Sequence, residues 1–256
     1  MNDDLKQAAG LSFLEKTTLD RATIRTAYRP HYGTVPAYKS YPDTAIVALP
    51  RAAWQLSEAR IINLLQHRRS LRTFADSPVS LHQLAFVLWA SQGVTALAGS
   101  HLLRTAPSAG ALYPIETYVS LQRVEGQASG IYHFDIRAFQ LRLVVEGDQG
   151  NGLAAAFLGQ QFLGQAAFCL VWTAVSRRSM GKYGDRGVRY LLLDAGHICQ
   201  NALLAAEAVN LGSCPAAAFY DRELNDLLGI DGYEEIALYG AAFGAKQKTT
   251  TPFAGR

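Results

Sequence analysis

Apolar and polar positions recur at helical spacing in several parts of the chain. After Ser80, a residue type that favours the start of a helix, Leu84 and Leu88 fall on one face of a predicted helix. By the same criteria we predict helices over residues 1–26, 57–67, 80–91, 148–158, 186–210 and 221–228. Gly212 is expected to end the longest internal helix, 186–210, as a glycine C-cap.

Short runs rich in β-forming residues lie between these helices. They predict strands over residues 116–122, 130–134, 140–145, 166–174 and 235–243, and the continuous apolar run 166–174 indicates a buried central strand. Helices and strands are mixed without regular βαβ alternation, so the expected fold class is α+β. The sequence contains neither a Gly-x-Gly-x-x-Gly turn after a strand nor a Gly-Lys-Ser/Thr loop. Rossmann dinucleotide binding and NTP hydrolysis are therefore disfavoured.

The N-terminal part has a different composition from the rest. Between residues 28 and 50 four prolines alternate with four tyrosines, a pattern that favours extended backbone packed across the domain or across a partner subunit. We therefore predict a helix and Pro/Tyr-rich arm over 1–55, one domain over 56–245, and a polar tail over 246–256.

Composition narrows the class of protein. The chain has 256 residues, 49% hydrophobic and 18% charged, with 24 basic and 21 acidic residues. A net charge of +3 is too small to indicate nucleic acid binding, whereas local basic clusters fit a small anionic ligand. Three scattered cysteines without metal-ligand spacing predict a reduced protein with no metal site. With no signal peptide and no long apolar run, we expect a soluble cytoplasmic protein that binds neither membrane nor nucleic acid.

Two segments suggest a phosphorylated cofactor. The arginine segment, Arg68-Arg69-Ser70-Leu71-Arg72, concentrates three guanidinium groups that could hold an anion, or could simply complement the end of the preceding helix. The small-residue loop, residues 107–112, lies between two prolines in the run Thr105-Ala-Pro-Ser-Ala-Gly-Ala-Leu-Tyr-Pro-Ile-Glu116. Such a loop allows backbone N–H groups to approach a flat or anionic ligand closely.

These two motifs carry a family resemblance. The arginine segment followed by Phe74 resembles the opening FMN motif of the nitroreductase superfamily, and Pro107-Ser-Ala-Gly-Ala-Leu-Tyr-Pro114 resembles its SagB/ThcOx branch. That branch contains the FMN-dependent azoline dehydrogenases of thiazole and oxazole peptide biosynthesis. The resemblance extends from about Tyr38 to Gly244. It implies a nitroreductase-like fold with a mixed, mostly antiparallel sheet flanked by helices, and a homodimer that binds FMN in its interface.

The resemblance also assigns cofactor-binding residues. The arginine segment would hold the FMN phosphate and ribityl chain, and the small-residue loop would line the isoalloxazine ring. The segment after the long helix would approach the flavin by its backbone. The residues carried over are Arg68, Arg69, Ser70, Arg72, Pro107, Ser108, Ala109, Gly110, Ala111, Leu112, Gly212 and Ser213. Lys246 and Lys248 are candidates for a further cation at the phosphate.

Lys182 and Tyr183 match a pair that is implicated in catalysis in the same branch. A desolvating flavin pocket with Arg178 and Arg186 nearby disfavours an ammonium ion, which makes the Lys182 amine available as a base, and the Tyr183 phenol can relay a proton. The alternative is a surface lysine at the start of a helix, where its charge would oppose the helix dipole.

A polar stripe follows on the next helix, at Tyr190, Asp194, His197 and Asn201. We interpret it as a structural feature in which Asp194 and His197 form a hydrogen-bonded pair at a helix or subunit interface. His197 is therefore left out of the predicted catalytic set.

The resemblance implies hydride transfer from a substrate carbon to flavin N5 in an azoline-type peptide substrate. Two alternatives remain: an NAD(P)H-dependent nitro or quinone reductase, and a flavin-binding subunit that is active only with a partner protein such as a cyclodehydratase. The sequence does not indicate whether the substrate is a peptide or a small molecule.

Overall fold

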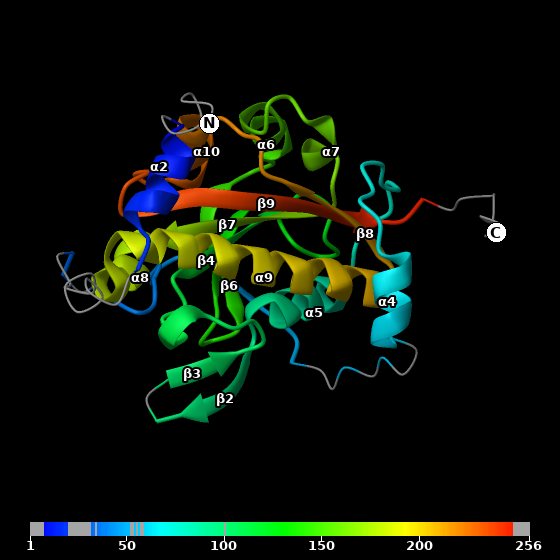
Figure 1. The fold of residues 1–256 in the computed structure, drawn as a ribbon. Helices are drawn as coiled ribbons and strands as arrows, with labels where there is room; N and C mark the ends of the chain where they lie inside the picture. The colour runs from blue at the N-terminus through cyan, green and yellow to red at the C-terminus, as the bar shows by residue number, and fades with distance from the viewer. Residues whose placement is uncertain are drawn as a thin grey trace, which may run out of the picture.

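A seven-stranded antiparallel sheet forms the centre of the protein (Figure 1). The computed structural model describes residues 8–19, 32–33, 35–51, 54, 56, 59–99 and 101–247. The strand order is β1-β6-β5-β4-β7-β9-β8. The strands are β1 (Ile46–Ala48), β4 (Ile115–Leu121), β5 (Gly130–Asp135), β6 (Gln140–Glu146), β7 (Phe168–Val175), β8 (Leu211–Ala216) and β9 (Glu235–Ala245). In the described residues all neighbours in this sheet pair antiparallel, as expected for the predicted α+β fold.

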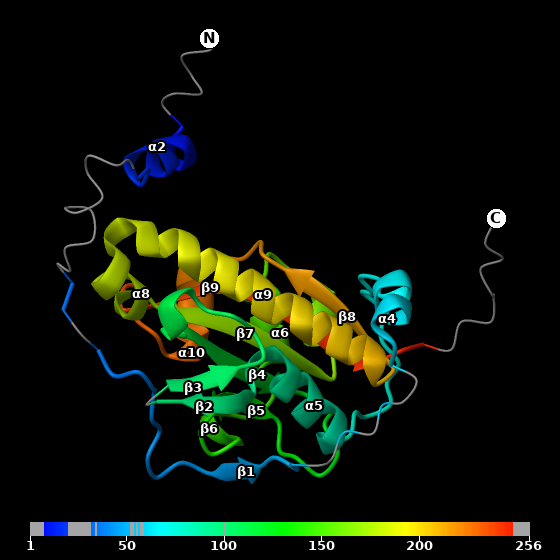
Figure 2. The same cartoon turned by 60° about the horizontal axis from the view of Figure 1, so that its bottom comes forward.

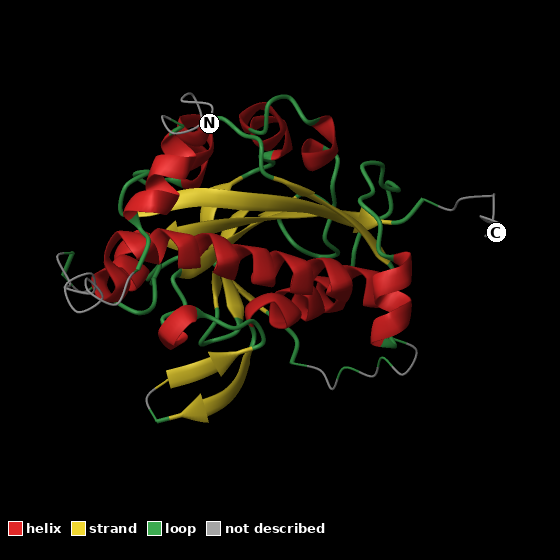
Figure 3. Ribbon diagram, viewed as in Figure 1, coloured by secondary structure: helices red, strands yellow, loops and turns green. Residues whose placement is uncertain are grey.

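Helices cover both faces of this sheet. On one face lie the long helix α9 (Gly187–Ala208) and helix α5 (Leu81–Gln92); on the other lie α6 (Gly150–Ala156), α7 (Gln161–Gly164) and α10 (Asp221–Leu228) (Figures 1 and 3). The remaining elements are α2 (Ala9–Lys16), α4 (Ile61–His67), α8 (Ser176–Tyr183), the 3-10 turns η1 (Ala109–Ala111) and η2 (Gly184–Arg186), and the hairpin β2 (Val94–Ala98) and β3 (His101–Arg104). No helix in the described part of the chain is long and apolar enough to cross a membrane.

The central strands are buried on both sides because their side chains alternate between two hydrophobic cores. Val119 and Leu170 pack toward α5 and α9, whereas Tyr118 and Val171 pack toward α6 and α10. Burying a large apolar side chain contributes roughly 1.5–3 kcal/mol. The run 166–174 therefore forms the predicted central strand, β7, between β4 and β9.

Helix α5 begins where the sequence predicts. The Ser80 hydroxyl accepts the Gln83 backbone N–H at 3.2 Å, and the Gln83 side chain accepts the Ser80 N–H at 3.0 Å, which completes a capping box. The Gln83 amide also donates to the Val209 carbonyl at 2.9 Å. This cap therefore ties the start of α5 to the end of α9.

The prediction that Gly212 caps the long helix is wrong. Helix α9 stops at Ala208, and the left-handed residue that redirects the chain is Asn210, with φ of 58°. Asparagine tolerates this conformation better than most residues with a side chain. Gly212 lies instead in β8, an edge strand that pairs with β9 and that the sequence pattern does not reveal.

The N-terminal prediction is correct only in part. The helix expected over 1–26 is formed by Ala9–Lys16 and ends at Thr17; residues 1–7 and 20–26 lie outside the described residues. The Thr17 hydroxyl accepts an N–H of Arg189 at 2.8 Å, so α2 is attached to α9. The described part of the arm contains bends at residues 37–38 and a turn at 42–43, and its extended part is β1, which pairs with β6.

Candidate functional site

The arginine segment is held against the sheet by its backbone. Ser70 forms a parallel bridge with Ser213 of β8, and the Leu71 N–H donates to the Ser213 carbonyl at 2.9 Å. A Cβ atom on Gly212 would lie 3.1 Å from the Leu71 side chain, so a larger residue would be crowded there. The structure therefore brings together two of the predicted cofactor-binding segments, 68–72 and 212–213.

The arginine side chains differ in their partners. Arg69 turns back on its own segment and donates to the carbonyls of Gln66 and Arg68, both at 2.8 Å. The Arg72 guanidinium lies 5.9 Å from the centre of the Phe162 ring. Neither Arg68 nor Arg72 has a carboxylate within ion-pair distance in the described residues. Their charge can therefore serve an external anion such as a phosphate.

Lys246, one of the two suggested additional cations, already has an acidic partner. The Lys246 ammonium pairs with the Glu207 carboxylate at 2.7 Å, so it is already neutralised by a partner on α9. Its backbone bridges Phe74, which places it beside the arginine segment. Lys248 lies outside the described residues.

The small-residue loop is held in place by hydrogen bonds of Ser108, one of them to helix α9. The Ser108 hydroxyl donates to the Asp194 carboxylate at 2.5 Å and accepts the Tyr113 N–H at 2.9 Å. Burial raises the pKa of Asp194, and the hydrogen bond from Ser108 opposes that rise. The expected pair of Asp194 with His197 is not formed; Asp194 uses its carboxylate to hold the loop. The Ser108 side chain is thus engaged in this brace, which leaves the backbone of the loop as the surface for a ligand.

The loop has a strained backbone at its centre. Gly110, Ala111 and Tyr113 all have positive φ, at 63°, 53° and 46°. For a residue with a side chain this region costs of order 1–3 kcal/mol and is retained where the surroundings enforce it, frequently at functional sites. Here the enforcing contacts include the double hydrogen bond of Ser108.

Lys182 and Tyr183 converge on this loop. A Cβ atom built on Gly110 would lie 2.7 Å from Lys182 Nζ and still closer to the Tyr183 hydroxyl, so only glycine leaves room for both. The Tyr183 ring packs edge-on against Tyr190, with 4.9 Å between ring centres. The structure thus joins the two predicted catalytic side chains to the predicted flavin-lining loop.

The position of Lys182 corrects one interpretation. We expected a helix start here, but Lys182 is in the last turn of α8, where a positive charge complements the helix dipole. Its charge therefore fits a structural role as well as a catalytic one, and its proximity to Gly110 is what favours catalysis.

A pocket of about 250 Å³ lies directly beside Lys182. Its walls come from the arm, the small-residue loop and α8: Gly33, Val35, Ala37, Leu112, Arg177, Arg178, Gly181 and Lys182. Arg177 pairs with Glu234 at 2.5 Å and Arg178 with Glu116 at 2.6 Å. Lys182 has no carboxylate within 4 Å in the part of the chain that the structure describes.

A buried charge network under this pocket escaped the sequence analysis. Glu116 accepts hydrogen bonds from Arg178 at 2.6 Å and from His133 at 2.8 Å, and Arg178 also donates to the Pro36 carbonyl of the arm at 2.8 Å. Burial alone would raise the pKa of Glu116, but its hydrogen bond with His133 and the charge of Arg178 lower it to about 2. A glutamate within the otherwise mostly apolar strand β4 was the signal that could have indicated such a network.

The two groups of site residues lie along different parts of α9. The loop contacts the N-terminal half of this helix through Asp194, whereas α4 and the arginine segment lie toward its C-terminal end (Figures 1 and 2). In one copy of the chain, the arginine segment and the loop that contacts Lys182 therefore lie toward opposite ends of α9.

Known proteins resemble this chain over most of its length. The profile of the Nitroreductase family matches residues 65–245. MJ1384 of Methanocaldococcus jannaschii, whose name assigns it provisionally to the nitroreductases, is 36% identical over 191 residues, covering 75% of this chain and 93% of that protein. A provisionally assigned nitroreductase of Ralstonia eutropha JMP134 has a similar structure, with a TM-score of 0.66 and 25% identity over 87% of this chain and 99% of that one.

Two further relatives are named for peptide processing. The microcin B17-processing protein McbC of Escherichia coli is 29% identical, covering 55% of this chain and 54% of that protein. The trifolitoxin-processing protein TfxB of Rhizobium leguminosarum is also 29% identical, but only 39% of it is covered. The family match makes this chain an oxidoreductase. The chain belongs to the nitroreductase family.

Proposed function

We propose that this protein is an FMN-dependent dehydrogenase that oxidises an azoline-type ring in a peptide to the aromatic azole. The observation that carries the proposal is the convergence of Lys182 Nζ and the Tyr183 hydroxyl on Gly110 of the small-residue loop. A flavin reductase needs no base that removes a proton from carbon, because a nicotinamide delivers a hydride without such a loss. The similarity to McbC and TfxB, which are named for processing peptide antibiotics, supports the same direction.

The residues present fit FMN. Arg68 and Arg72 offer guanidinium groups without carboxylate partners among the described residues, and Ser70 is exposed beside them, which suits a phosphate. The backbone at Gly110 is open to a flat ring because no side chain stands there. When bound, FMN would accept a hydride at N5 and pass the electrons to dioxygen. We retain all of the predicted cofactor-binding residues in this role, with Ser108 acting through its backbone.

A homodimer would bring the two regions together. Leu192 and Leu193 are 55% and 58% exposed on α9, next to Gly196 and His197, which are also exposed. A second copy packed along this face would bury these leucines and place its arginine segment near the loop of the first copy. We propose that the flavin binds in this interface, that residues 56–245 form the flavin domain, and that 1–55 and 246–256 form the arm and tail.

The reaction removes one proton and one hydride from adjacent ring carbons. Lys182 Nζ would accept the proton, and the hydride with its electron pair would leave from the neighbouring carbon, so that the ring gains a double bond. Tyr183 would hold or relay the proton through its hydroxyl. The pocket between the arm and α8 would hold the ring next to Lys182. We assign the protein to the cytoplasm, where buried cysteines without disulfide bonds, as here, are usual.

A second candidate is an NAD(P)H-dependent nitro or quinone reductase. The greater coverage and identity of MJ1384 favour it, because that protein carries a nitroreductase name. A flavin-binding subunit that acts only beside a partner is a variant of the first proposal, and a cyclodehydratase is the partner class that would supply an azoline.

The proposals are separated by two assays on FMN-loaded protein. We expect FMN to raise the melting temperature and an azoline peptide to be oxidised with consumption of dioxygen. Rapid oxidation of NADPH in the presence of a nitroaromatic would favour the reductase, if the azoline peptide is not oxidised even when the cyclodehydratase is present. A protein that neither binds FMN nor is stabilised by it would contradict both enzyme proposals.

A further inference from the structure

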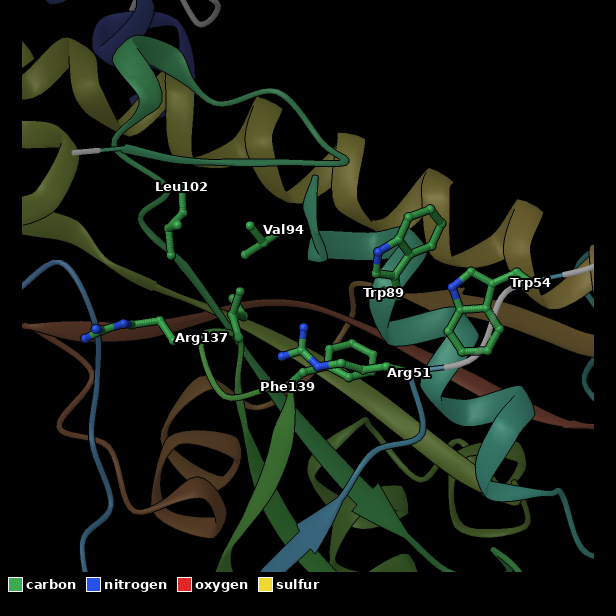
Figure 4. A pocket seen from close by; sticks show the side chains of 8 residues that line it. Arg51, Trp54, Trp89, Val94, Leu102, Arg137 and Phe139 are labelled. Carbon is green, nitrogen blue, oxygen red and sulfur yellow. The ribbon is translucent and has the colours of Figure 1, made fainter. Parts of the chain in front are cut away.

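A second cavity, distinct from the pocket beside Lys182, has the chemistry of a ligand site. Its volume is about 320 Å³, within the range of small-molecule pockets. It lies at the root of the β2–β3 hairpin, between α5 and the turn that joins β5 to β6 (Figure 4). The lining residues are Arg51, Trp54, Trp89, Val94, Leu102, Ile136, Arg137 and Phe139.

The charge of this cavity is positive. Two arginines and no acidic residue line it. The Arg51 guanidinium stacks 5.2 Å from the centre of the Phe139 ring and donates one N–H to the Ala138 carbonyl at 3.2 Å. A guanidinium has five N–H donors, so most of those on Arg51 remain for a ligand. Arg137 lies at the rim, where its side chain points away from Phe139 and its guanidinium packs over Tyr38 (Figure 4).

The acidic residue closest in sequence is already in use. Asp135 forms an ion pair with Arg142 at 3.7 Å and accepts the Ala138 N–H at 3.1 Å. In the described residues neither Arg51 nor Arg137 has a carboxylate within ion-pair distance. The cavity therefore presents cationic donors that the described residues do not neutralise.

The other side of the cavity is aromatic. The rings of Trp54 and Trp89 lie 6.3 Å apart, and the Trp89 indole nitrogen is on the edge of its ring that faces Val94 and Arg51 (Figure 4). No acceptor for this N–H exists in the described part of the chain. An aromatic wall with one N–H donor, opposite a guanidinium, matches a flat aromatic group that carries an anionic oxygen.

Hydrogen bonds connect the wall of the cavity to Thr105, which lies shortly before the small-residue loop. The Thr105 N–H donates to the Gly93 carbonyl at 2.9 Å, and the Thr105 hydroxyl donates to the Trp89 carbonyl at 3.3 Å. Thr105 begins the run that leads into residues 107–112. A ligand against Trp89 would thus lie one short segment away from the loop that contacts Lys182.

We propose that this cavity is a binding site for an aromatic carboxylate, with Arg51 and the Trp89 indole as polar contacts and Trp54 and Phe139 as the aromatic walls. An aromatic ring with a nearby carboxylate is found both in a peptide that ends in an aromatic residue and in a free aromatic acid. The site does not depend on flavin or on the reaction proposed above.

The test compares N-acetyl-phenylalanine with its uncharged amide by calorimetry and by tryptophan fluorescence. Of the three tryptophans, Trp172 is fully buried, so the change in fluorescence reports mainly on Trp54 and Trp89. We expect the acid to bind on the order of tenfold more tightly than the amide, as for a hydrogen bond to a charged group. Acetyl-Gly-Gly-Phe distinguishes the sources: equal or tighter binding than the single residue indicates a peptide, and much weaker binding a free acid.

Variants assign the effect to the cavity. Arg51→Gln should remove the preference for the acid, and Trp89→Phe should weaken acid binding while the aromatic wall is kept. Arg222→Gln, an exposed arginine on α10, should change neither. Equal binding of acid and amide, absence of binding, or an unchanged preference in both folded variants would overturn the proposal. If Arg51→Gln fails to fold, Trp89→Phe alone decides.

Discussion

The small-residue loop and the arginine segment are built in opposite ways. The side chains of the loop and its surroundings already have partners: Ser108 donates to Asp194 of α9, and the nearby Arg178 is neutralised by Glu116. The arginine segment is fixed only through its backbone on β8, and Arg68 and Arg72 present charge without carboxylate partners in the described residues. The first region is thus arranged before any ligand binds, whereas the second requires an anion to balance its charge. This contrast predicts that changes in the loop affect catalysis or folding and that changes in the arginine segment affect cofactor affinity.

The largest expected effect is on turnover. Lys182→Met removes the proposed base but keeps the length of the side chain, and loss of general base catalysis lowers rates by about 10²–10⁴-fold. Azoline oxidation should fall by this factor while FMN affinity changes little. Lys16→Met, an exposed lysine on α2, is the matched control. Equal activity of the two variants would remove Lys182 from the mechanism.

A loss of stability should follow from Glu116→Gln. Breaking a buried ion pair costs about 3–5 kcal/mol, because Arg178 and His133 would lose their charged partner. Glu234→Gln breaks the exposed pair with Arg177 and should cost less than about 1 kcal/mol. Denaturant unfolding of both variants provides the measurement, and similar losses would mean that the buried network is not a structural support.

The same network predicts a pH dependence. The pKa of Glu116 is lowered from its ordinary value of 4.5 to about 2, so its ionised form is favoured by folding. Its contribution is therefore complete above about pH 4.5 and is lost as the pH falls toward 2. The difference in unfolding free energy between wild type and Glu116→Gln should shrink across this interval. A constant difference would show that the charge of Glu116 is not what stabilises the fold.

A pair of glycine variants distinguishes a steric clash of the added Cβ atom from strain in the backbone. Gly110 and Gly126 have φ of 63° and 70°, but a Cβ atom at Gly126 would meet nothing within 4 Å. Both alanine variants should lose about 1–2 kcal/mol from the left-handed backbone. Only Gly110→Ala should also displace Lys182 and Tyr183 and reduce turnover by about 10²-fold. Equal turnover in the two variants would show that the loop does not position the catalytic residues.

The smallest expected effect is the loss of FMN affinity on substitution in the arginine segment. Arg72→Gln should weaken FMN binding by on the order of tenfold, as for one charge-assisted hydrogen bond, and should leave the stability of the flavin-free protein unchanged. Arg60→Gln, an exposed arginine just before α4, is the control. FMN titration followed by fluorescence measures both. Unchanged affinity in Arg72→Gln would argue that the phosphate binds elsewhere.

Local signals were sufficient for much of the fold. Helix α10 spans Asp221–Leu228 as predicted, and the Ser80 cap was readable from the sequence, because each depends on neighbouring residues. Strand β8 was missed because Gly212 and Pro215 indicate a loop. As the edge strand next to β9, it tolerates a proline, and its glycine accommodates Leu71 and Phe74. These are tertiary contacts that no local pattern contains.

The sequence predicted which segments form the candidate site, but not which of their side chains contact one another. The motifs placed Ser70, Ser213 and Gly110 in a site, and the structure shows how the first two pair. The partner of Asp194 is Ser108, 86 residues earlier, so the nearer His197 was a natural but wrong choice. Glu116 could be assigned no role from the sequence, because its partners come from α8 and β5.

Single-turnover reduction of the flavin tests the central claim most directly. FMN-loaded wild type, Lys182→Met and Lys16→Met would be mixed with an azoline peptide in the absence of dioxygen, and the flavin absorbance followed with time. We expect rapid bleaching in wild type and Lys16→Met, and bleaching slowed by about 10²–10⁴-fold in Lys182→Met with the flavin still bound. Bleaching of Lys182→Met at the wild-type rate would contradict this expectation.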